Sequence, residues 1–318
     1  MIIVPMTRSQ FLQYLAITGF TSGWAVSSSH SYAALGSAQD DKARHSRIIP
    51  SSGERIPAIG LGTWITFGID IRNTEVLNNR IAILHEFLQK GGGVLDSSPM
   101  YGTAEEVIGK GLARLNNHHN LFSATKVWTS GNRQGALQME QSRQLWGVDR
   151  LDLMQVHNLL DWETHLPGLQ AMKQAGDIRY VGVTTSHGRR HKELEQIMRT
   201  QDLDFVQFTY NMLDREAENI LLPLAQDRGI AVIINRPFQR GGLFERFENY
   251  PLPPWSVEID CDNWAQFFLK FIISHPAVSC AIPATSKLVH LRENMAAGYG
   301  ELPDKTMRQN MINYIKTL

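Results

Sequence analysis

Residues 153–183 read LMQVHNLLDWETHLPGLQAMKQAGDIRYVGV, a stretch with two short apolar runs and an amphipathic segment between them. The apolar runs are residues 153–156 and 180–183, and residues 166–175 have the spacing of a helix followed by glycine. Parallel strands covered on both faces give continuous apolar runs, and a helical crossover must join them. The stretch therefore predicts one strand-helix-strand unit of a parallel sheet.

The same pattern recurs along most of the chain. Six further apolar runs of strand length, which make eight with the two above, lie at residues 58–61, 94–97, 122–125, 205–208, 231–234 and 279–282. Amphipathic helical stretches separate them, among them residues 75–90, 105–115 and 221–228. Eight strand-helix units in a row predict an α/β fold of the (β/α)8 TIM barrel type.

Two additions to this barrel are expected. Apolar residues on both sides of the Ser51-Ser52-Gly53 turn predict an N-terminal hairpin before the first barrel strand, and residues 304–318 predict an extra C-terminal helix. No low-complexity tract or Pro/Ser-rich linker interrupts residues 46–318. We therefore expect one barrel domain over residues 46–318.

The composition is that of an ordinary soluble globular chain, with 43% hydrophobic and 19% charged residues among 318. Lys plus Arg (31) balances Asp plus Glu (31), so the formal net charge is zero. Such a chain has no long-range field to attract phosphate backbones or anionic lipid, and we expect no nucleic-acid partner. Cys261 and Cys280 match no metal or redox spacing.

Residues 1–45 differ in composition from the rest and are interpreted as a leader or disordered segment, possibly a signal peptide. Arg8 is the only charged side chain before Asp40, and an apolar run over residues 14–26 precedes the small-x-small sequence Ser31-Tyr32-Ala33. The apolar run is too short for a stable membrane span.

The segment from Thr7 to Gln13 resembles a degenerate twin-arginine export signal, with Ser9 where the second arginine belongs. A general secretory signal, or a tail without an address, are the alternatives. We expect an exported protein, periplasmic if the source is bacterial, rather than a cytoplasmic one.

Four polar side chains follow consecutive predicted strands. Asp96 and Tyr101 come after the second strand, Lys126 after the third and His157 after the fourth. Taken singly, each has an ordinary structural explanation, such as a turn cap, a wall residue, a surface charge or a buried imidazole. Because the catalytic groups of such barrels gather at the C-terminal ends of the strands, we expect the four side chains to share one site.

This set of groups has the chemistry of carbonyl reduction. A phenol has a pKa near 10; a neighbouring lysine that an aspartate keeps protonated is expected to lower that pKa and make the phenol a usable proton donor. An imidazole opposite can donate a hydrogen bond to a carbonyl oxygen. No side chain supplies a hydride, so a nicotinamide or flavin cofactor is required.

A series of short motifs runs in order through the chain after residue 45. They are Gly60-Leu61-Gly62-Thr63-Trp64, Leu95-Asp96, Tyr101-Gly102-Thr103-Ala104-Glu105 with Gly109, Thr125-Lys126, Gln155-Val156-His157, residues 176–183, Gln207 through Asn211, and Ile282-Pro283-Ala284-Thr285-Ser286 through Glu293-Asn294. In these motifs the sequence resembles the aldo/keto reductase family. The resemblance implies that Tyr101 is the general acid, that Lys126 and Asp96 tune it, that His157 orients the carbonyl and that Trp64 and Trp128 wall the substrate pocket.

The resemblance also implies an extended NAD(P)H site without the GxGxxG motif, which this chain lacks. The residues that the resemblance implies for this NAD(P)H site are Gly62, Thr63, Trp64, Thr184, Thr185 and Gln207, then Asn235, Arg236, Pro237 and Phe238, then Thr285, Ser286, Lys287, His290, Glu293 and Asn294. Lys287 and two hydroxyls suit a dianionic 2′-phosphate, so NADP(H) is favoured and NAD(H) is possible. A helix cap at Thr285 or Ser286, and a tight turn at the Gly60/Gly62 doublet, are the structural alternatives.

Two departures from the family pattern stand out. Thr185 occupies the position of a usual asparagine that binds the carboxamide, and residues 235–238 replace an aromatic residue that often stacks on the nicotinamide. Arg236 and Tyr210 are candidates to cover the ring. Together with Trp64 and Trp128, residues 251–255 suggest an apolar, aromatic-walled mouth.

Two other functions compete with carbonyl reduction of a small-molecule substrate. A metal-dependent hydrolase would need a His-x-His pair on an early strand, which is absent, and we interpret His187 and His191 as solvated surface, so no metal site is predicted. A nucleotide-binding barrel with slow turnover, acting as a sensor or accessory subunit, is the second alternative. No motif specifies the substrate or the oligomeric state.

Overall fold

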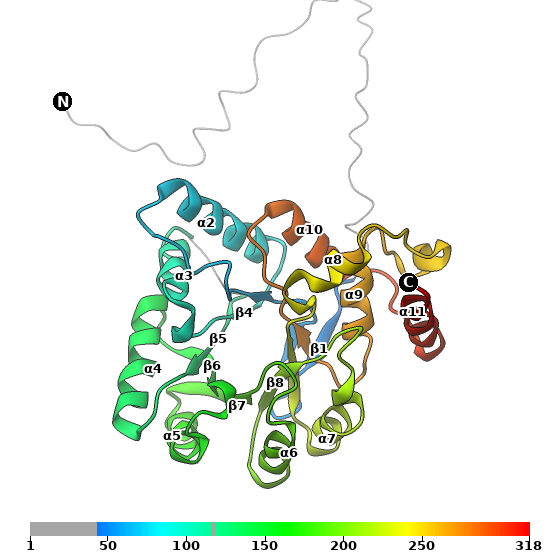
Figure 1. Cartoon of the computed structure of the whole chain (residues 1–318). Coiled ribbons are helices and arrows are strands. Elements are labelled where there is room, and N and C mark those ends of the chain that lie inside the picture. The colour runs from blue at the N-terminus through cyan, green and yellow to red at the C-terminus, as the bar shows by residue number, and fades with distance from the viewer. Residues whose placement is uncertain (1–42, 116–118) are drawn as a thin grey trace, which may run out of the picture. The chain divides into compact units, whose positions relative to one another are not determined.

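Eight parallel strands form the centre of the computed structural model, which describes residues 43–115 and 119–318 (Figure 1). In the order in which they neighbour one another, the strands are β3 (Leu61–Gly62), β4 (Val94–Asp96), β5 (Phe122–Val127), β6 (Leu151–Val156), β7 (Ile178–Thr184), β8 (Phe205–Thr209), β9 (Ala231–Asn235) and β10 (Cys280–Ala281). Each corresponds to one predicted apolar run, so the (β/α)8 barrel is confirmed.

The barrel closes where β10 meets the first strand. Parallel bridges join Ile59 to Ala281 and Gly62 to Ala284. A Cβ at Gly62 would lie 2.7 Å from the carbonyl oxygen of Ile282, a distance that real Cβ atoms do not adopt. The glycine is therefore required by the close approach of two backbones at the seam, which is a different reason from a tight turn.

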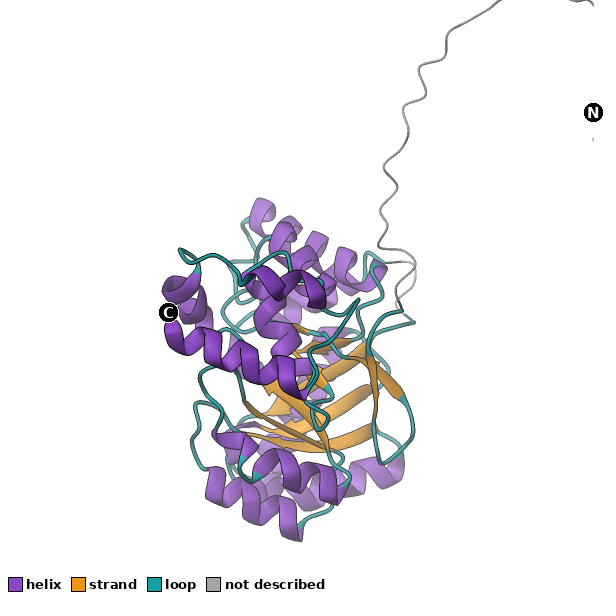
Figure 2. Ribbon diagram, turned by 90° about the vertical axis from the view of Figure 1, so that its right-hand side faces the viewer, coloured by secondary structure: helices purple, strands orange, loops and turns teal. Residues whose placement is uncertain are grey.

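Helices cover the outside of the strands (Figure 2). They are α2 (Thr74–Gln89), α3 (Ala104–Leu112), α4 (Asn132–Trp146), α5 (Trp162–Ala175), α6 (His191–Thr200), α7 (Leu221–Arg228), α8 (Gly242–Phe247), α9 (Trp264–Ile273), α10 (Leu288–Ala296) and α11 (Lys305–Thr317). Side chains of Asn73, Asn263 and Asp304 accept hydrogen bonds from the first turns of α2, α9 and α11. The predicted C-terminal helix is thus present, with Asp304 as its cap.

The predicted hairpin closes the N-terminal end of the barrel. Strands β1 (Ser46–Ile48) and β2 (Arg55–Pro57) pair antiparallel. Ile49, which follows β1, and Ile56 of β2 belong to the buried cluster that includes Val94, Phe122 and Leu153 from the barrel strands. With this end filled by apolar side chains, a cavity has room at the opposite end, where the strands terminate.

Folded structure begins slightly before the predicted boundary. The backbone N–H of His45 donates to the carbonyl of Gly298 over 2.8 Å. Residues 1–42, which contain nearly all of the predicted leader, lie outside the described residues. Within the ranges that are described, no helix combines the length and apolarity needed to cross a membrane.

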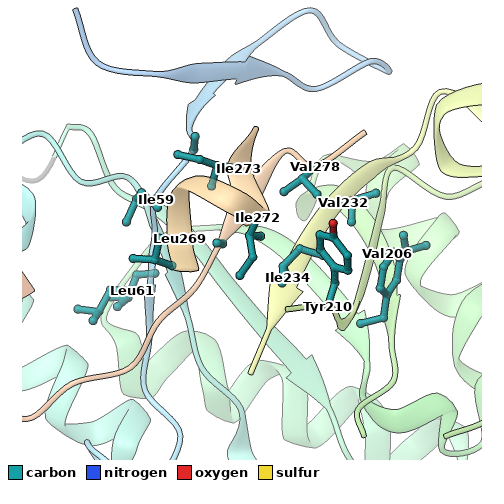
Figure 3. Packing of buried hydrophobic residues seen from close by; sticks show 14 of the residues in the cluster. Ile59, Leu61, Val206, Tyr210, Val232, Ile234, Leu269, Ile272, Ile273 and Val278 are labelled. Atoms are coloured by element: carbon teal, nitrogen blue, oxygen red, sulfur yellow. The ribbon is translucent and has the colours of Figure 1, made fainter. Parts of the chain in front are cut away.

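A second hydrophobic layer lies between the strands and the helices. All ten residues of α9 are buried, and Leu269 and Ile272 of this helix pack in one cluster with Ile234 of β9 (Figure 3). This layer holds the strands rigidly, so the side chains that follow each strand are placed by the barrel itself.

Candidate active site

A cavity of about 670 Å³ opens at the C-terminal ends of the strands. Thirteen of the residues predicted from the sequence line it: Gly62, Thr63, Trp64, Asp96, Tyr101, His157, Thr184, Thr185, Gln207, Asn235, Arg236, Pro237 and Phe238. The four predicted catalytic groups come together here, three of them in the lining and Lys126 fully buried directly behind Asp96.

The floor of the cavity is a buried ion pair between neighbouring strands. The ammonium Nζ of Lys126, at 0% exposure, lies 2.7 Å from Oδ2 of Asp96 and 2.7 Å from the carbonyl oxygen of Ser97. The side-chain amides of Gln207 and Gln155 donate to Oδ1 of Asp96 over 2.9 and 3.3 Å. Because both carboxylate oxygens are occupied, the pair has the additional hydrogen bonds that a buried salt bridge requires.

Tyr101 projects from the loop after β4 into the cavity. Its ring lies 5.3 Å from Nζ of Lys126 and makes an edge contact with the ring of His157, with centroids 5.7 Å apart. Burial and the negative charge of Asp96 raise the pKa of Tyr101 well above its usual value. This direction is opposite to our expectation, because Lys126 directs its charge to Asp96 and burial dominates.

His157 begins the loop after β6 and is held as a neutral imidazole. Burial, reinforced by the positive charge of Lys126, lowers the pKa of His157 to about 2. Its Nδ1 lies 2.9 Å from the hydroxyl of Ser98. Among the described residues no hydrogen bond to Nε2 of His157 is formed, and the residue lines the cavity. A neutral imidazole in this place is suited to hydrogen-bond a carbonyl oxygen without carrying charge.

Glu105 is a buried carboxylate beside the site to which our sequence analysis gave no role. Hydroxyls of Thr125 and Ser142 and the indole N–H of Trp146 donate to it over 2.6, 2.9 and 3.0 Å. Burial raises the pKa of Glu105, and these donors together with Lys126 oppose the rise. Glu105 and Glu106 both stand in the first turn of α3, where acidic residues are common, so no signal in the sequence marked Glu105 as buried. The cluster ties α3, which follows Tyr101, to β5, which carries Lys126.

The residues predicted for the nicotinamide amide lie together at the end of β7 and within the neighbouring β8. The hydroxyl of Thr184 accepts a hydrogen bond from the backbone N–H of Asn158 over 3.0 Å. The neighbouring hydroxyl of Thr185 is buried and has no hydrogen-bond partner among the described residues. Buried hydroxyls are normally paired, so an unpaired one at a cavity wall is suited to bind a ligand.

Loops with unusual backbone conformations make up the rim. The residues at positive φ that line the cavity without being glycine are Ile65, Asn158, His187, Arg190, Arg236 and Arg240, with φ between 52° and 66°. The guanidinium of Arg240 lies 4.9 Å from the Trp64 ring, and Nη1 of Arg236 lies 2.6 Å from Nε2 of His187. Strained backbone of this kind concentrates at binding sites.

This arrangement of strand ends agrees with the comparison of the sequence with known families. The model of the aldo/keto reductase family matches residues 58–256. The chain belongs to the aldo/keto reductase family. It is therefore an NAD(P)H-dependent oxidoreductase.

Curated relatives and solved structures agree with this assignment. Methylglyoxal reductase YeaE of Escherichia coli is 29% identical over 79% of this chain and 88% of its own length. The NADH-specific methylglyoxal reductase of the same species is 28% identical over 58% of this chain, and the match covers 64% of that relative, slightly less than two thirds. Among solved structures, aldo-keto reductase AKR11C1 from Bacillus halodurans has a TM-score of 0.71 at 21% identity, covering 86% of this chain and 96% of that one. An aldo/keto reductase from Klebsiella pneumoniae in complex with NADP and acetate gives 0.69 at 23%, covering 82% and 92%. At these identities the structural likeness supports the fold alone.

The adenosine-end residues predicted from the family do not line the cavity. They are Thr285, Ser286, Lys287, His290, Glu293 and Asn294. The hydroxyl of Thr285 accepts from the backbone N–H of Lys287 over 3.1 Å in a local turn before α10, and no described side chain caps that helix, so the helix cap that we considered as the alternative is not formed. Arg80 of α2, which our sequence analysis did not single out, donates to the carbonyl of Ser286 over 3.4 Å and brings a second cation to this segment.

Two aromatic expectations differ from the structure. Tyr210 is fully buried in the cluster shown in Figure 3, and its hydroxyl lies 2.6 Å from Glu218 and 2.7 Å from Arg308, so it does not reach the cavity. Trp255 packs on Phe267 and Tyr314 instead of lining a mouth. Apolar residues 251–255 therefore serve the contact between α9 and α11.

Trp128 is 42% exposed and is not among the residues that line the cavity, whereas Trp64 is. The solvated-surface interpretation holds for His187, which is exposed although it also lines the cavity. It is wrong for His191, whose side chain is only 11% exposed and lies 3.7 Å from Glu216. Arg236 is the remaining candidate to cover a nicotinamide ring, because it lines the cavity and Tyr210 does not.

Proposed function

We propose that this aldo/keto reductase catalyses the NADPH-dependent reduction of an aldehyde or ketone to an alcohol. The observation that supports the proposal most directly is the meeting of a phenol, a neutral imidazole and a buried Asp96–Lys126 pair at one cavity. Neither a metal nor a nucleophilic side chain is needed for this chemistry, since the hydride adds to the carbonyl carbon and the proton to the carbonyl oxygen.

In the proposed mechanism, His157 donates a hydrogen bond from Nε2 to the substrate oxygen and so fixes the direction of the carbonyl. Bound nicotinamide supplies the hydride. As negative charge develops on the oxygen, Tyr101 donates its phenolic proton to it. The raised pKa of Tyr101 keeps the phenol protonated at neutral pH, and an alkoxide is a far stronger base than a phenolate, so the transfer remains favourable.

The residues of the cavity wall fit a nicotinamide amide. The buried, unpaired hydroxyl of Thr185 would bind one atom of the carboxamide, beside Gln207, whose amide nitrogen is already held by Asp96. Arg236 would lie at the ring, as a planar group able to cover a π-face. The unpaired Thr185 hydroxyl supports this assignment because the described part of the chain provides no partner for it.

NADPH is proposed as the preferred form of the cofactor, with NADH as the alternative. Lys287 is exposed at the beginning of α10, where unsatisfied backbone N–H groups favour an anion, and Arg80 reaches the adjoining Ser286. The relatives differ on this point, since one is named as NADH-specific and one structural neighbour is in complex with NADP. The ratio of the KM values for the two cofactors tests the preference, and Lys287→Ala should raise only the KM for NADPH.

The test of the proposed reaction is NADPH oxidation with a panel of carbonyl compounds. Methylglyoxal belongs in the panel because one relative carries that activity in its name. Tyr101→Phe should lower kcat by about 10²–10⁴-fold, the usual contribution of general acid catalysis, with little change in NADPH affinity measured by fluorescence. Tyr314→Phe, which removes a tyrosine hydroxyl bonded to Pro251 far from the cavity, is the control. Tight NADPH binding without turnover of any carbonyl would favour the sensor alternative instead.

We also propose that residues 1–45 export the protein, by a twin-arginine-like signal around Arg8. This proposal rests on sequence alone, since residues 1–42 lie outside the described part of the chain. A route that carries folded proteins would deliver the reductase with its cofactor already bound. Fractionation should place a reporter fused after residue 45 outside the cytoplasm, and Arg8→Ala should retain the reporter in the cytoplasm. Retention of the unmodified fusion in the cytoplasm would contradict the proposal.

A further inference from the structure

Ser98 lies next to the proposed catalytic groups but has no role in the mechanism above. It directly precedes the short 3-10 helix Pro99–Tyr101, and its side chain is fully buried. Its hydroxyl oxygen lies 3.2 Å from the backbone N–H of Met100 and 2.9 Å from Nδ1 of His157. This one hydroxyl therefore connects the helix that carries Tyr101 to the imidazole opposite.

The direction of the hydrogen bond to His157 follows from counting donors and acceptors. The N–H of Met100 can only donate, so the oxygen of Ser98 accepts from it. The proton of the Ser98 hydroxyl then needs an acceptor, and within the described residues Nδ1 of His157 is the only one in reach. If Nδ1 carried the proton instead, the hydroxyl proton would be buried without an acceptor.

From this we propose that Ser98 is a positioning residue that fixes the tautomer of His157, with the proton on Nε2. The inference rests on the proposed function. A neutral imidazole has one donor and one acceptor nitrogen, and only the Nε2–H form can donate to a carbonyl oxygen in the cavity. With the other tautomer, the lone pair of Nε2 would face the carbonyl oxygen and repel it.

Two features make the tautomer consequential at this site. Burial and Lys126 keep His157 from gaining a second proton, so a charged imidazolium with two donors is not available. The edge contact between the rings of His157 and Tyr101 also limits rotation of the imidazole. The direction of the Ser98 hydroxyl is then the element that selects which nitrogen donates.

The direct test is NMR of the holoenzyme with 15N-labelled histidine, in which the nitrogen shifts report the protonated position of each ring. The signals of His157 are assigned by their loss in His157→Gln. We expect the Nε2–H form in the unmodified protein and a mixture of tautomers in Ser98→Ala. A pure Nδ1–H form in the unmodified protein would overturn the proposal, whatever the activity of the enzyme.

Kinetics provide the second test. Ser98→Ala should lower kcat by about 10–100-fold, the range found when a residue that orients a functional histidine is removed, with the KM for NADPH unchanged. Ser98→Thr keeps the hydroxyl and should restore most of the activity. The control is Ser123→Ala. Ser123 is also buried, and its hydroxyl accepts from the backbone N–H of Asp152 and donates to the carboxylate of Asp152, away from the cavity. Ser123→Ala should keep the kcat of the unmodified enzyme.

A double-mutant cycle separates the tautomer from the capping role of Ser98. In a His157→Gln background the tautomer no longer exists, so adding Ser98→Ala should change kcat by less than about twofold. An undiminished 10–100-fold loss in that background would show that Ser98 acts through the helix of Tyr101, and would overturn the proposal. If no carbonyl compound is reduced by the unmodified protein, the proposed function fails, and the NMR result still decides the tautomer.

Discussion

The floor and the rim of the cavity are built by opposite means. On the floor, Asp96 and Lys126 lie near the ends of strands β4 and β5, their side chains are at most 3% exposed, and both carboxylate oxygens of Asp96 accept hydrogen bonds. On the rim, Arg236 directly follows β9 and Arg240 lies in the short 3-10 helix Gln239–Gly241; both have left-handed backbone angles, of 52° and 64°, and form no ion pair with a described carboxylate. The floor has one possible arrangement, whereas the rim is held by a few contacts that a ligand can replace.

This difference suggests a division of labour. A buried charge pair with both carboxylate oxygens occupied is rigid and suits a reaction that requires fixed geometry. Arginines that stack on an indole or bond to a neutral imidazole are available to an anion such as the cofactor diphosphate. The predictions below compare the two regions, beginning with the largest expected effect.

Removing the buried cation should have the largest effect. Lys126→Met leaves Asp96 charged and buried without its partner, which costs about 3–5 kcal/mol of folding free energy, and kcat should fall by about 10³-fold because the Tyr101 site loses its electrostatic support. Unfolding in urea and steady-state kinetics measure the two losses. Lys173→Met is the control, since it removes a 2.7 Å pair with Asp204 that lies outside the cavity and is partly exposed. Equal effects of the two changes on kcat would contradict the special role of the floor.

The second prediction concerns acid. The folded pKa of His157, about 2, is far below the ordinary value of 6.5, so the protein favours the neutral ring. The resulting stability is fully present above about pH 6.5 and is lost as the pH falls towards 2. At pH 5 the loss is about 2 kcal/mol, from 1.5 pH units at 1.36 kcal/mol each.

Urea unfolding at pH 7 and pH 5 measures this loss. Between pH 7 and pH 5, the free energy of unfolding should decrease by about 2 kcal/mol less in His157→Gln than in the unmodified protein. The remaining decrease should include His275, whose pKa is lowered to about 4 by burial and by Arg308. If the free energy of unfolding decreases as much in His157→Gln as in the unmodified protein, the fold does not hold the His157 ring neutral.

The Asp96–Lys126 pair on the floor of the cavity was predictable from the sequence, because the order of the strands places the two residues near each other. Once residues 94–97 and 122–125 are assigned to adjacent strands, Asp96 and Lys126 must end near each other. The donors that satisfy Asp96 were not predictable, since Gln207 is 111 residues away and nothing in its spacing shows that its amide turns inward. The contact between Ser98 and His157 was not predictable for the same reason.

The rim was predictable only in part. Arg236 was identified, but Arg240 and the Arg80 contact depend on loop conformations that apolar periodicity does not encode. Tyr210 was a candidate to cover the nicotinamide ring because it is nearby in the sequence and a phenol can stack on a ring face, whereas its ring packs among buried side chains and its hydroxyl bonds to Glu218. Position after a strand predicts proximity to the site, but the direction of a side chain is set by packing.

The third prediction tests the rim directly. Arg240→Gln should weaken NADPH binding by about tenfold, close to the contribution of one charge-assisted hydrogen bond, and should make binding less sensitive to salt. Fluorescence titration at two ionic strengths measures both changes. Arg246→Gln, a change of an arginine that stacks on Phe247 and does not line the cavity, is the matched control. If Arg240→Gln lowers kcat as much as Lys126→Met does, Arg240 takes part in the reaction itself, like the residues of the floor, and the division between the two regions is wrong.

The smallest effect is expected for a substitution of Thr185, which should stabilise the fold but weaken NADPH binding. The buried hydroxyl has no partner among the described residues, and such a group costs the fold about 1 kcal/mol. Thr185→Val keeps the shape and removes the hydroxyl, so the protein without cofactor should become more stable by roughly this amount, while NADPH binding should weaken by about fivefold as the carboxamide loses a partner.

Thr184→Val is the control: its hydroxyl accepts from Asn158, so the same change there should lower stability. Urea unfolding and fluorescence titration of both variants decide the matter. A loss of stability in Thr185→Val would mean that this hydroxyl already has a partner in solution, and the wall of the cavity would then resemble the floor rather than the rim.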